Sequence, residues 1–164
     1  MPDTFRFVIV GSGNIAGTYN AAVSNIDRAD IAGLVSRSLN RPDWLPGDTE
    51  VADSLEKIAC EYDAVILATP NGLHCEGAVE AAGLGKHVLT EKVLDISVEH
   101  MDRMMKACDE GGVKLGVAFQ RRMSPDYKIM KDILEKGKFG KIYAADLYVK
   151  FYRDQDYYDS SSYR

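Results

Sequence analysis

Residues 5–17, FRFVIVGSGNIAG, decide the fold of this chain. The run Phe5–Val10 predicts a strand, and the glycine turn Gly11-Ser12-Gly13-Asn14-Ile15 follows it directly. Apolar residues at helical spacing up to Ile26 then predict a helix. Gly11 allows a tight turn, and Gly13 lets the backbone approach a pyrophosphate at the helix N-terminus, where free N–H groups and the positive dipole end point outward. The stretch therefore predicts a dinucleotide site.

The third glycine of this motif is replaced by Ala16, an accepted variant. A tight strand-to-helix turn without a ligand is the plainer alternative, and the rest of the pattern weighs against it. Helical segments separate five further strand-like runs. These runs are Asp30–Ser36, Thr49–Ala52, Asp63–Ala68, Lys86–Thr90 and Val113–Phe119. Such alternation predicts an α/β Rossmann fold with a doubly wound parallel sheet, which we assign to residues 1–120 as an NAD(P)-binding domain.

Residues 121–164 have a different pattern. Ser124-Pro125 predicts the start of a helix that ends at Gly137. The segment Lys141–Tyr152 alternates apolar and polar side chains, which predicts a half-buried antiparallel strand with an exposed edge. This change of pattern separates residues 121–164 from the parallel-sheet unit.

Composition excludes several classes of protein. The formal charge is −5 and no run of Lys and Arg stands out, so a nucleic-acid partner is not expected. No apolar stretch approaches the roughly 20 residues that a membrane helix needs, and no secretion signal is visible, which predicts a cytoplasmic protein without a membrane partner. Three scattered cysteines and three histidines lack disulfide or metal-ligand spacing, so we expect reduced thiols and no metal.

The end of the second strand bears on the choice of cofactor. Enzymes that prefer NAD usually place a carboxylate there to hold the ribose hydroxyls. This chain has Ser36-Arg37-Ser38 instead. A guanidinium flanked by two hydroxyls suits a 2′-phosphate, so NADP is favoured and NAD is the alternative. A solvated surface arginine is the plainer explanation of Arg37.

Further polar residues follow other strands, where ligands of open α/β sheets bind. They are Ala68-Thr69-Pro70-Asn71 with His74, then Glu91-Lys92, then Gln120-Arg121-Arg122. Each has a plainer alternative. Asn71 can cap a helix, His74 can be a surface residue of a first helical turn, and Glu91 can be the ionic partner of Lys92.

Several of these segments together resemble the glucose–fructose oxidoreductase / inositol dehydrogenase (Gfo/Idh/MocA) family. The matching segments are ATPNGLH at 68–74, GKHVLTEK at 85–92, GVAFQRR at 116–122 and GKFGKI at 137–142. The resemblance implies an NAD(P)-dependent oxidoreductase acting on sugars, cyclitols or their derivatives, with a C-terminal sheet that commonly makes a homo-oligomer. On this resemblance, residues 121–164 are the incomplete start of an α/β C-terminal domain for substrate binding and oligomerisation. It also implies an active-site role for Lys92, the lysine of the family's Glu-Lys-Pro motif, and a place near the nicotinamide for Pro70, Asn71 and His74.

The residues at these strand ends form the predicted site. The predicted cofactor contacts are Gly11, Ser12, Gly13, Asn14, Ile15, Ser36, Arg37, Ser38, Ala68, Thr69, Pro70, Asn71, His74, Glu91, Lys92 and Arg121. Lys92 is the predicted catalytic residue. An ordinary lysine has a pKa of about 10.4, so Lys92 acts either as a base with a pKa lowered by burial or as a charged donor that orients the substrate oxygen.

The sequence departs from the family pattern at two points. Val93 replaces the proline of the Glu-Lys-Pro motif, which loosens the backbone beside Lys92. Family members are roughly twice as long, and the resemblance places their catalytic histidine in an Asp-x-x-x-His motif that residues 1–164 do not contain. We therefore expect little dehydrogenase activity from this chain alone. A non-catalytic dinucleotide sensor and an interaction protein on a Rossmann scaffold remain alternatives to the oxidoreductase.

Overall fold

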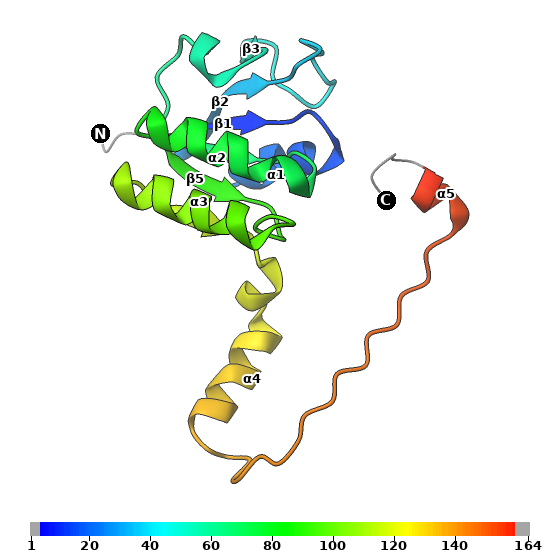
Figure 1. Cartoon of the computed structure of the whole chain (residues 1–164). Coiled ribbons are helices and arrows are strands. Elements are labelled where there is room, and N and C mark those ends of the chain that lie inside the picture. Colours follow the sequence, from blue (N-terminus) through cyan, green and yellow to red (C-terminus); the bar gives the residue numbers. More distant parts are fainter. Residues whose placement is uncertain (1–3, 160–164) are drawn as a thin grey trace. The chain divides into compact units, whose positions relative to one another are not determined.

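A computed structural model describes residues 4–159, and its core is one sheet of six parallel strands (Figure 1). The strands lie in the order β3-β2-β1-β4-β5-β6. Their bounds are β1 Phe5–Val10, β2 Ala29–Val35, β3 Glu50–Ala52, β4 Ala64–Leu67, β5 His87–Thr90 and β6 Leu115–Val117. Because the chain runs outward from β1 in one direction and returns to β4 on its other side, the strand order reverses between β1 and β4. The predicted doubly wound parallel sheet is confirmed.

Helices cover both faces of this sheet. Helix α1 (Asn14–Val23) lies on one face, and helices α2 (His74–Gly83) and α3 (Val98–Glu110) lie side by side on the other (Figure 1). Neighbouring residues of a strand point to opposite faces, so Val8 packs with α2 and α3 while Ile9 packs with α1. Both are fully buried, which explains why the central part of β1 is apolar on both faces.

Short 3₁₀ helices complete this part of the chain. They are η1 (Leu55–Lys57) and η2 (Asn71–Leu73), and η2 leads directly into α2. The loop between β2 and β3 packs against α1, since a Cβ on Gly17 would lie 3.1 Å from the Trp44 ring. None of the helices between residues 4 and 159 has the length and apolar character that crossing a membrane requires.

The chain divides into two compact units, of which the first ends at Ala118 and the second is Phe119–Arg164. The second unit contains η3 (Gln120–Met123), α4 (Pro125–Glu135) and α5 (Gln155–Asp159). Ser124 and Pro125 begin α4 as predicted. Its residues are largely exposed, and no residue of α4 is buried.

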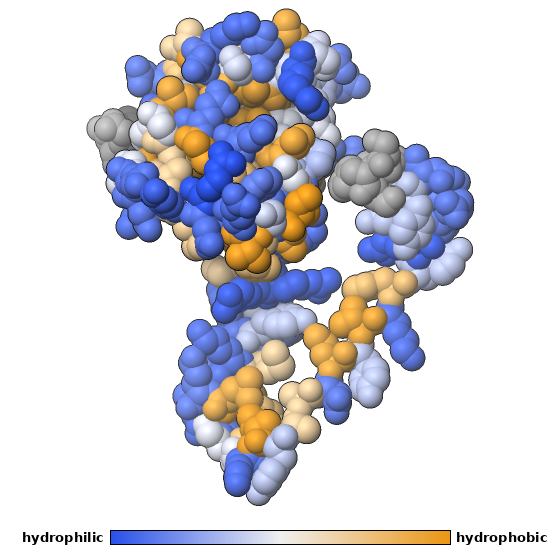
Figure 2. Space-filling model, viewed as in Figure 1, coloured by the Kyte–Doolittle hydropathy of each residue, from blue (hydrophilic) through white to orange (hydrophobic). Residues whose placement is uncertain are grey.

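The predicted strand Lys141–Tyr152 is wrong: the structure has no strand between residues 119 and 159. Tyr143, Leu147 and Tyr152 are each more than four-fifths exposed. Hydrophobic side chains are exposed to solvent along the extended segment that follows α4 (Figure 2). A strand is stabilised by hydrogen bonds and packing to a neighbouring strand, and residues 119–159 place none beside this segment. Alternation alone therefore predicted which side chains share a face, but not that a partner strand would be present.

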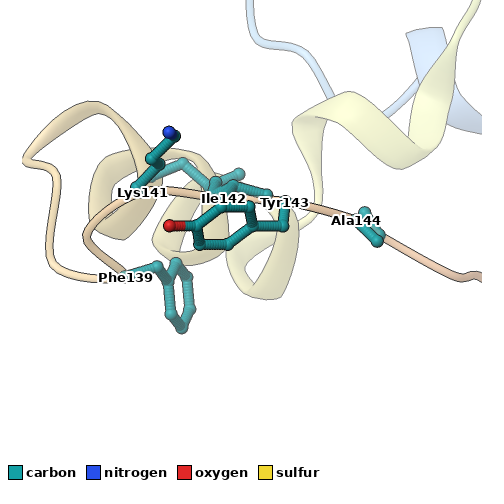
Figure 3. A pocket seen from close by; sticks show the side chains of 7 residues that line it. Phe139, Lys141, Ile142, Tyr143 and Ala144 are labelled. Atoms are coloured by element: carbon teal, nitrogen blue, oxygen red, sulfur yellow. The ribbon is translucent and has the colours of Figure 1, made fainter.

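An open hollow of about 470 Å³ lies at the end of α4 and the turn that follows it (Figure 3). Leu134, Phe139, Ile142 and Tyr143 are among the residues that line it. None of the predicted site residues lines it. The chemistry predicted from the sequence thus lies elsewhere, at the carboxyl ends of the strands.

Candidate functional site

Four of the predicted segments lie at one edge of the sheet. The glycine turn follows β1, residues 36–38 follow β2, residues 68–71 follow β4, and residues 91–92 follow β5. Since all these strands are parallel, their carboxyl ends share one edge. Arg121 lies apart from them in sequence, exposed on η3 of the second unit.

Gly11 makes the turn compact. Its φ of +107° is a conformation that residues with a side chain rarely adopt, and a Cβ there would lie 2.7 Å from the carbonyl oxygen of Ala68. Its N–H donates to the carbonyl oxygen of Val35 at 2.9 Å. The turn is therefore held between the ends of β2 and β4, and only glycine fits there.

Gly13 leaves the N-terminus of α1 open. It is the N-cap residue, no side chain caps the helix, and a Cβ at this position would meet nothing within 4 Å. Asn14 and Ile15 begin the helix, and the first N–H groups of any helix have no acceptor within it. The open space in front of these donors fits a pyrophosphate, whose charge the helix dipole favours.

Three hydroxyl groups meet beside the turn. Ser36 Oγ donates to Ser12 Oγ at 3.3 Å and lies 3.3 Å from Ser38 Oγ. Ser36 is buried, whereas Arg37 and Ser38 are exposed. The structure brings Ser12 and Ser36–Ser38 together with an accessible guanidinium, which is a suitable donor set for a ribose or a phosphate on it.

The segment after β4 contains a buried hydroxyl without a partner. Within the described chain, Thr69 Oγ1 is inaccessible to solvent and makes no hydrogen bond. Buried hydroxyls in folded proteins nearly always have one. Ala68 is buried beside Gly11, while Pro70 is exposed and Asn71 half-buried. A group bound at this edge is the kind of partner that Thr69 lacks, so the residues present fit a dinucleotide.

Two of the plainer alternatives are wrong. Asn71 does not cap α2, because the N-cap residue is Leu73 and no side chain makes a capping bond. His74 is not a surface residue but is fully buried. His74 Nδ1 lies 3.0 Å from the carbonyl oxygens of both Val93 and Leu94, and Nε2 lies 3.1 Å from that of Thr69. Its ring thus joins the segment after β4 to the segment after β5.

Glu91 and Lys92 end β5 in different surroundings. Glu91 is nine-tenths buried, and its Oε2 accepts from the backbone N–H of Lys92 at 3.2 Å rather than from the ammonium group. Lys92 is exposed, which favours its role as a charged hydrogen-bond donor over that of a buried base. The peptide bond between Lys92 and Val93 is cis.

Asp95 holds this segment from the other side, and the sequence offered no signal for it. It is 1% exposed, and its carboxylate accepts from the N–H groups of Cys75, Ile96 and Ser97 and lies 3.0 Å from His100 Nδ1. Burial raises the pKa of Asp95, but these donors outweigh burial and hold the pKa below its ordinary value. The negative charge therefore stabilises the starts of α2 and α3.

Among residues 4–159, no group of three or more His, Cys, Asp or Glu side chains is arranged to hold a metal ion. The cysteines are free, and Cys75 and Cys108 are buried.

Comparison with known proteins places this geometry in a family. Residues 5–119 match the oxidoreductase family with an NAD-binding Rossmann fold, GFO_IDH_MocA. The chain belongs to this family. The match begins at the first residue of β1 and extends two residues past β6, so it covers the whole sheet and every candidate residue except Arg121. The resemblance predicted from the strand-end motifs is confirmed.

The chain is similar in sequence or in structure to several dehydrogenases. The WlbA dehydrogenase from Bordetella pertussis, solved in complex with NADH and UDP-GlcNAcA, is 34% identical with a TM-score of 0.89, covering 99% of this chain and 49% of that one. The D-xylose 1-dehydrogenase [NADP(+)] of Haloarcula marismortui is 29% identical over 83% of this chain and 40% of its own length. A scyllo-inositol dehydrogenase from Lactobacillus casei, 24% identical over 84% of this chain and 43% of that one, has a TM-score of 0.75 and shares the fold. The chain thus spans about half the length of these relatives, or less.

Proposed function

We propose that the protein is an NAD(P)-dependent dehydrogenase of a carbohydrate substrate, and that this chain supplies its cofactor-binding part. The single observation that carries the proposal is the open N-terminus of α1 at Gly13 beside the tightly packed Gly11. Exposed Lys92 at the same sheet edge makes the site more than a binding site. A sensor without catalysis has no comparable use for this lysine.

Each proposed contact has a part in holding the dinucleotide. The N–H groups at Gly13, Asn14 and Ile15 bind the pyrophosphate, and residues 36–38 with Ser12 bind the adenosine ribose. Thr69, Pro70 and Asn71 border the nicotinamide half. His74 is buried, so its contribution is to fix the backbone of Thr69 and Val93 rather than to touch the cofactor. Arg121 stays a proposed contact of the whole protein.

The chemistry is hydride transfer, which the nicotinamide ring supplies when bound. Oxidation of a substrate carbinol moves a hydride to that ring and releases the hydroxyl proton to a base. Lys92 donates a hydrogen bond from its ammonium group to the substrate oxygen and so fixes the carbinol carbon toward the ring. The proton acceptor belongs to the whole protein, in the part that the family resemblance assigns to a histidine.

The cofactor choice is tested by calorimetric titration of the chain with NADP and with NAD. We expect NADP to bind more tightly, because Arg37 provides a charged hydrogen-bond donor at the end of β2. Replacing Arg37→Asp should weaken NADP binding at least tenfold, about 1.4 kcal/mol, and should not weaken NAD binding, because a carboxylate at this position can accept from the ribose hydroxyls. Arg28→Asp, an exposed arginine at the opposite end of β2, is the matched control. An unchanged ratio of the two affinities in Arg37→Asp would reject NADP as the preferred cofactor.

We propose a UDP-linked sugar acid as the substrate class. The support is the WlbA dehydrogenase with bound UDP-GlcNAcA. Its similarity covers 99% of this chain and so includes the second unit. The test is NAD(P)H formation by the whole protein with UDP-GlcNAcA, scyllo-inositol and D-xylose. Turnover of the UDP-sugar acid alone supports the proposal, and turnover of a free sugar or cyclitol alone contradicts it.

Two properties of the whole protein belong to the same proposal: a cytoplasmic location and a homo-oligomeric state. Free Cys75 and Cys108 suit a reducing compartment. The exposed apolar side chains of residues 142–152 suit a surface that is covered in an assembly. Size measurement of the whole protein by light scattering tests the second, since a monomer would contradict it.

A further inference from the structure

A hydrogen bond links the helix that receives the dinucleotide to the segment that carries the lysine. The hydroxyl of Tyr19 on α1 donates to Glu91 Oε1 at 2.6 Å. In the sequence Tyr19 is one member of an apolar helical stripe, and its ring does pack into the core on the α1 side of the sheet. Its hydroxyl, however, has a polar use that the stripe does not indicate.

The link spans strands that are not neighbours. α1 follows β1, and Glu91 follows β5, while β4 lies between these two strands. No backbone hydrogen bond of the sheet can join β1 to β5 directly. The side chains of Tyr19 and Glu91 therefore provide a direct connection between the glycine-turn helix and the end of β5.

Glu91 depends on this bond. The side chain is nine-tenths buried, and among residues 4–159 it has no cationic partner. One carboxylate oxygen accepts from Tyr19 and the other from the backbone N–H of Lys92. A buried carboxylate needs donors on its oxygens, so the Tyr19 hydroxyl determines where this carboxylate lies, and the carboxylate in turn holds the Lys92 backbone.

The donor role of Tyr19 is a stable one. Burial, reinforced by the hydrogen bond and the charge of Glu91, raises the pKa of Tyr19 far above its usual value. The phenol therefore keeps its proton at neutral pH and can donate to Glu91. On the far side of Lys92, His74 contacts the carbonyl oxygens of Val93 and Leu94. Lys92 is thus flanked by residues that are fixed on both sides, one through α1 and one through α2.

We propose that Tyr19 is a positioning residue for Lys92: its hydroxyl fixes the Glu91 carboxylate and, through it, the backbone from which the lysine projects. The inference rests on the proposed function in that Lys92 is taken as an active-site residue. It deepens that function by making the position of the lysine depend on α1, the helix whose N-terminus receives the dinucleotide.

The test compares Tyr19→Phe with Tyr62→Phe. Both changes keep a ring that packs against the core and remove one hydroxyl. Tyr19 is partly buried and Tyr62 is buried, and Tyr62 precedes β4 at the opposite edge of the sheet. In the ¹⁵N NMR spectrum of the chain, we expect Tyr19→Phe to move the Lys92 amide signal and to speed its hydrogen exchange roughly tenfold, while the signals of β1 and β4 stay in place. Tyr62→Phe should leave Lys92 unchanged. A Lys92 amide that is unaffected by Tyr19→Phe would overturn the proposal.

Kinetics of the whole protein give an independent reading. If the Lys92 ammonium group is misplaced, its hydrogen bond stabilises the transition state less, while substrate binding changes little. Tyr19→Phe should therefore lower kcat roughly tenfold with KM nearly unchanged. Unchanged kcat counts against the proposal. The affinity of the chain for NADP or NAD, measured by calorimetry, tests the proposed function separately. Failure of the wild-type chain to bind either dinucleotide would reject that function, whereas the Lys92 amide would still report on the Tyr19 contact.

Discussion

Helices α3 and α4 are amphipathic in the same way, yet only α3 buries its apolar face. α3 places Met104 and Cys108 in the core beneath the sheet, whereas no residue of α4 is buried. The 3.6-residue period predicts that a helix has an apolar side, but another element has to supply the surface that covers it. The first unit contains such surfaces within its own sequence. In the second unit, the described residues near α4 leave every residue of this helix unburied.

The largest expected difference between the two units lies in their methionines. Met104 on α3 is fully buried, and Met130 on α4 is 47% exposed. Met104→Ala should lower the free energy of unfolding by about 2–5 kcal/mol, because it removes buried contacts and leaves a cavity. Met130→Ala, in an equally helical position, should change it by less than about 0.5 kcal/mol. Urea unfolding of both variants checks the contrast, and equal losses would show that α4 is packed as tightly as α3.

A second contrast concerns acidic residues. Asp95→Asn replaces a carboxylate oxygen by an amide group that cannot accept, so it should cost about 1–3 kcal/mol at neutral pH. Asp132 on α4 forms an exposed ion pair with Lys136 at 2.6 Å, and Asp132→Asn should cost less than about 1 kcal/mol. Thermal unfolding of the two variants at pH 7 gives the comparison. A loss of stability in Asp132→Asn as large as that in Asp95→Asn would contradict the difference in burial between the two carboxylates.

The pH dependence of stability follows from the same carboxylate. The pKa of Asp95 is lower in the folded than in the unfolded chain, where an ordinary aspartate has a pKa of about 3.9. Its stabilisation is therefore complete above that value and is lost as the pH falls through the folded pKa. Wild-type stability should decline below about pH 4, and the decline should be shallower in Asp95→Asn. Parallel acid-unfolding curves would show that Asp95 is not responsible.

The smallest contrast is between two helix caps. Ser97 Oγ accepts from the His100 N–H at 3.4 Å, while the Ser124 side chain makes no capping bond. Ser97→Ala should cost about 1 kcal/mol and Ser124→Ala only a few tenths, as measured by urea unfolding. A larger loss of stability in Ser124→Ala than in Ser97→Ala would contradict the capping bonds that the structure shows.

Much of the first unit could be predicted because local and global signals agree there. The run Phe5–Val10 is apolar, a glycine turn stops it, and the observed strand has those same bounds. Six strands in the right sequence order followed from such runs. The segment Lys141–Tyr152 could not be predicted in this way, since its alternation states which side chains share a face and says nothing of a neighbouring strand.

The sequence predicted individual residues of the candidate site but not the contacts between them. Gly11, Gly13 and Arg37 stand out in the sequence because their types suit a turn and a phosphate. His74 and Asp95 act through distant backbone groups, and Tyr19 acts through a residue 72 positions away. Such contacts arise from the winding of the sheet, so no local pattern carries them.

The central claim is that the space before Gly13 receives a dinucleotide. Calorimetric titration of Gly13→Val with NADP tests it most directly, because a Cβ at this position meets nothing within 4 Å in the protein itself. Gly83→Val, at the far end of α2 and also in open space, is the matched control. We predict that Gly13→Val folds with a stability within about 1 kcal/mol of wild type and that its NADP affinity falls at least tenfold, while Gly83→Val binds normally. Unchanged NADP binding by a folded Gly13→Val variant would contradict the account.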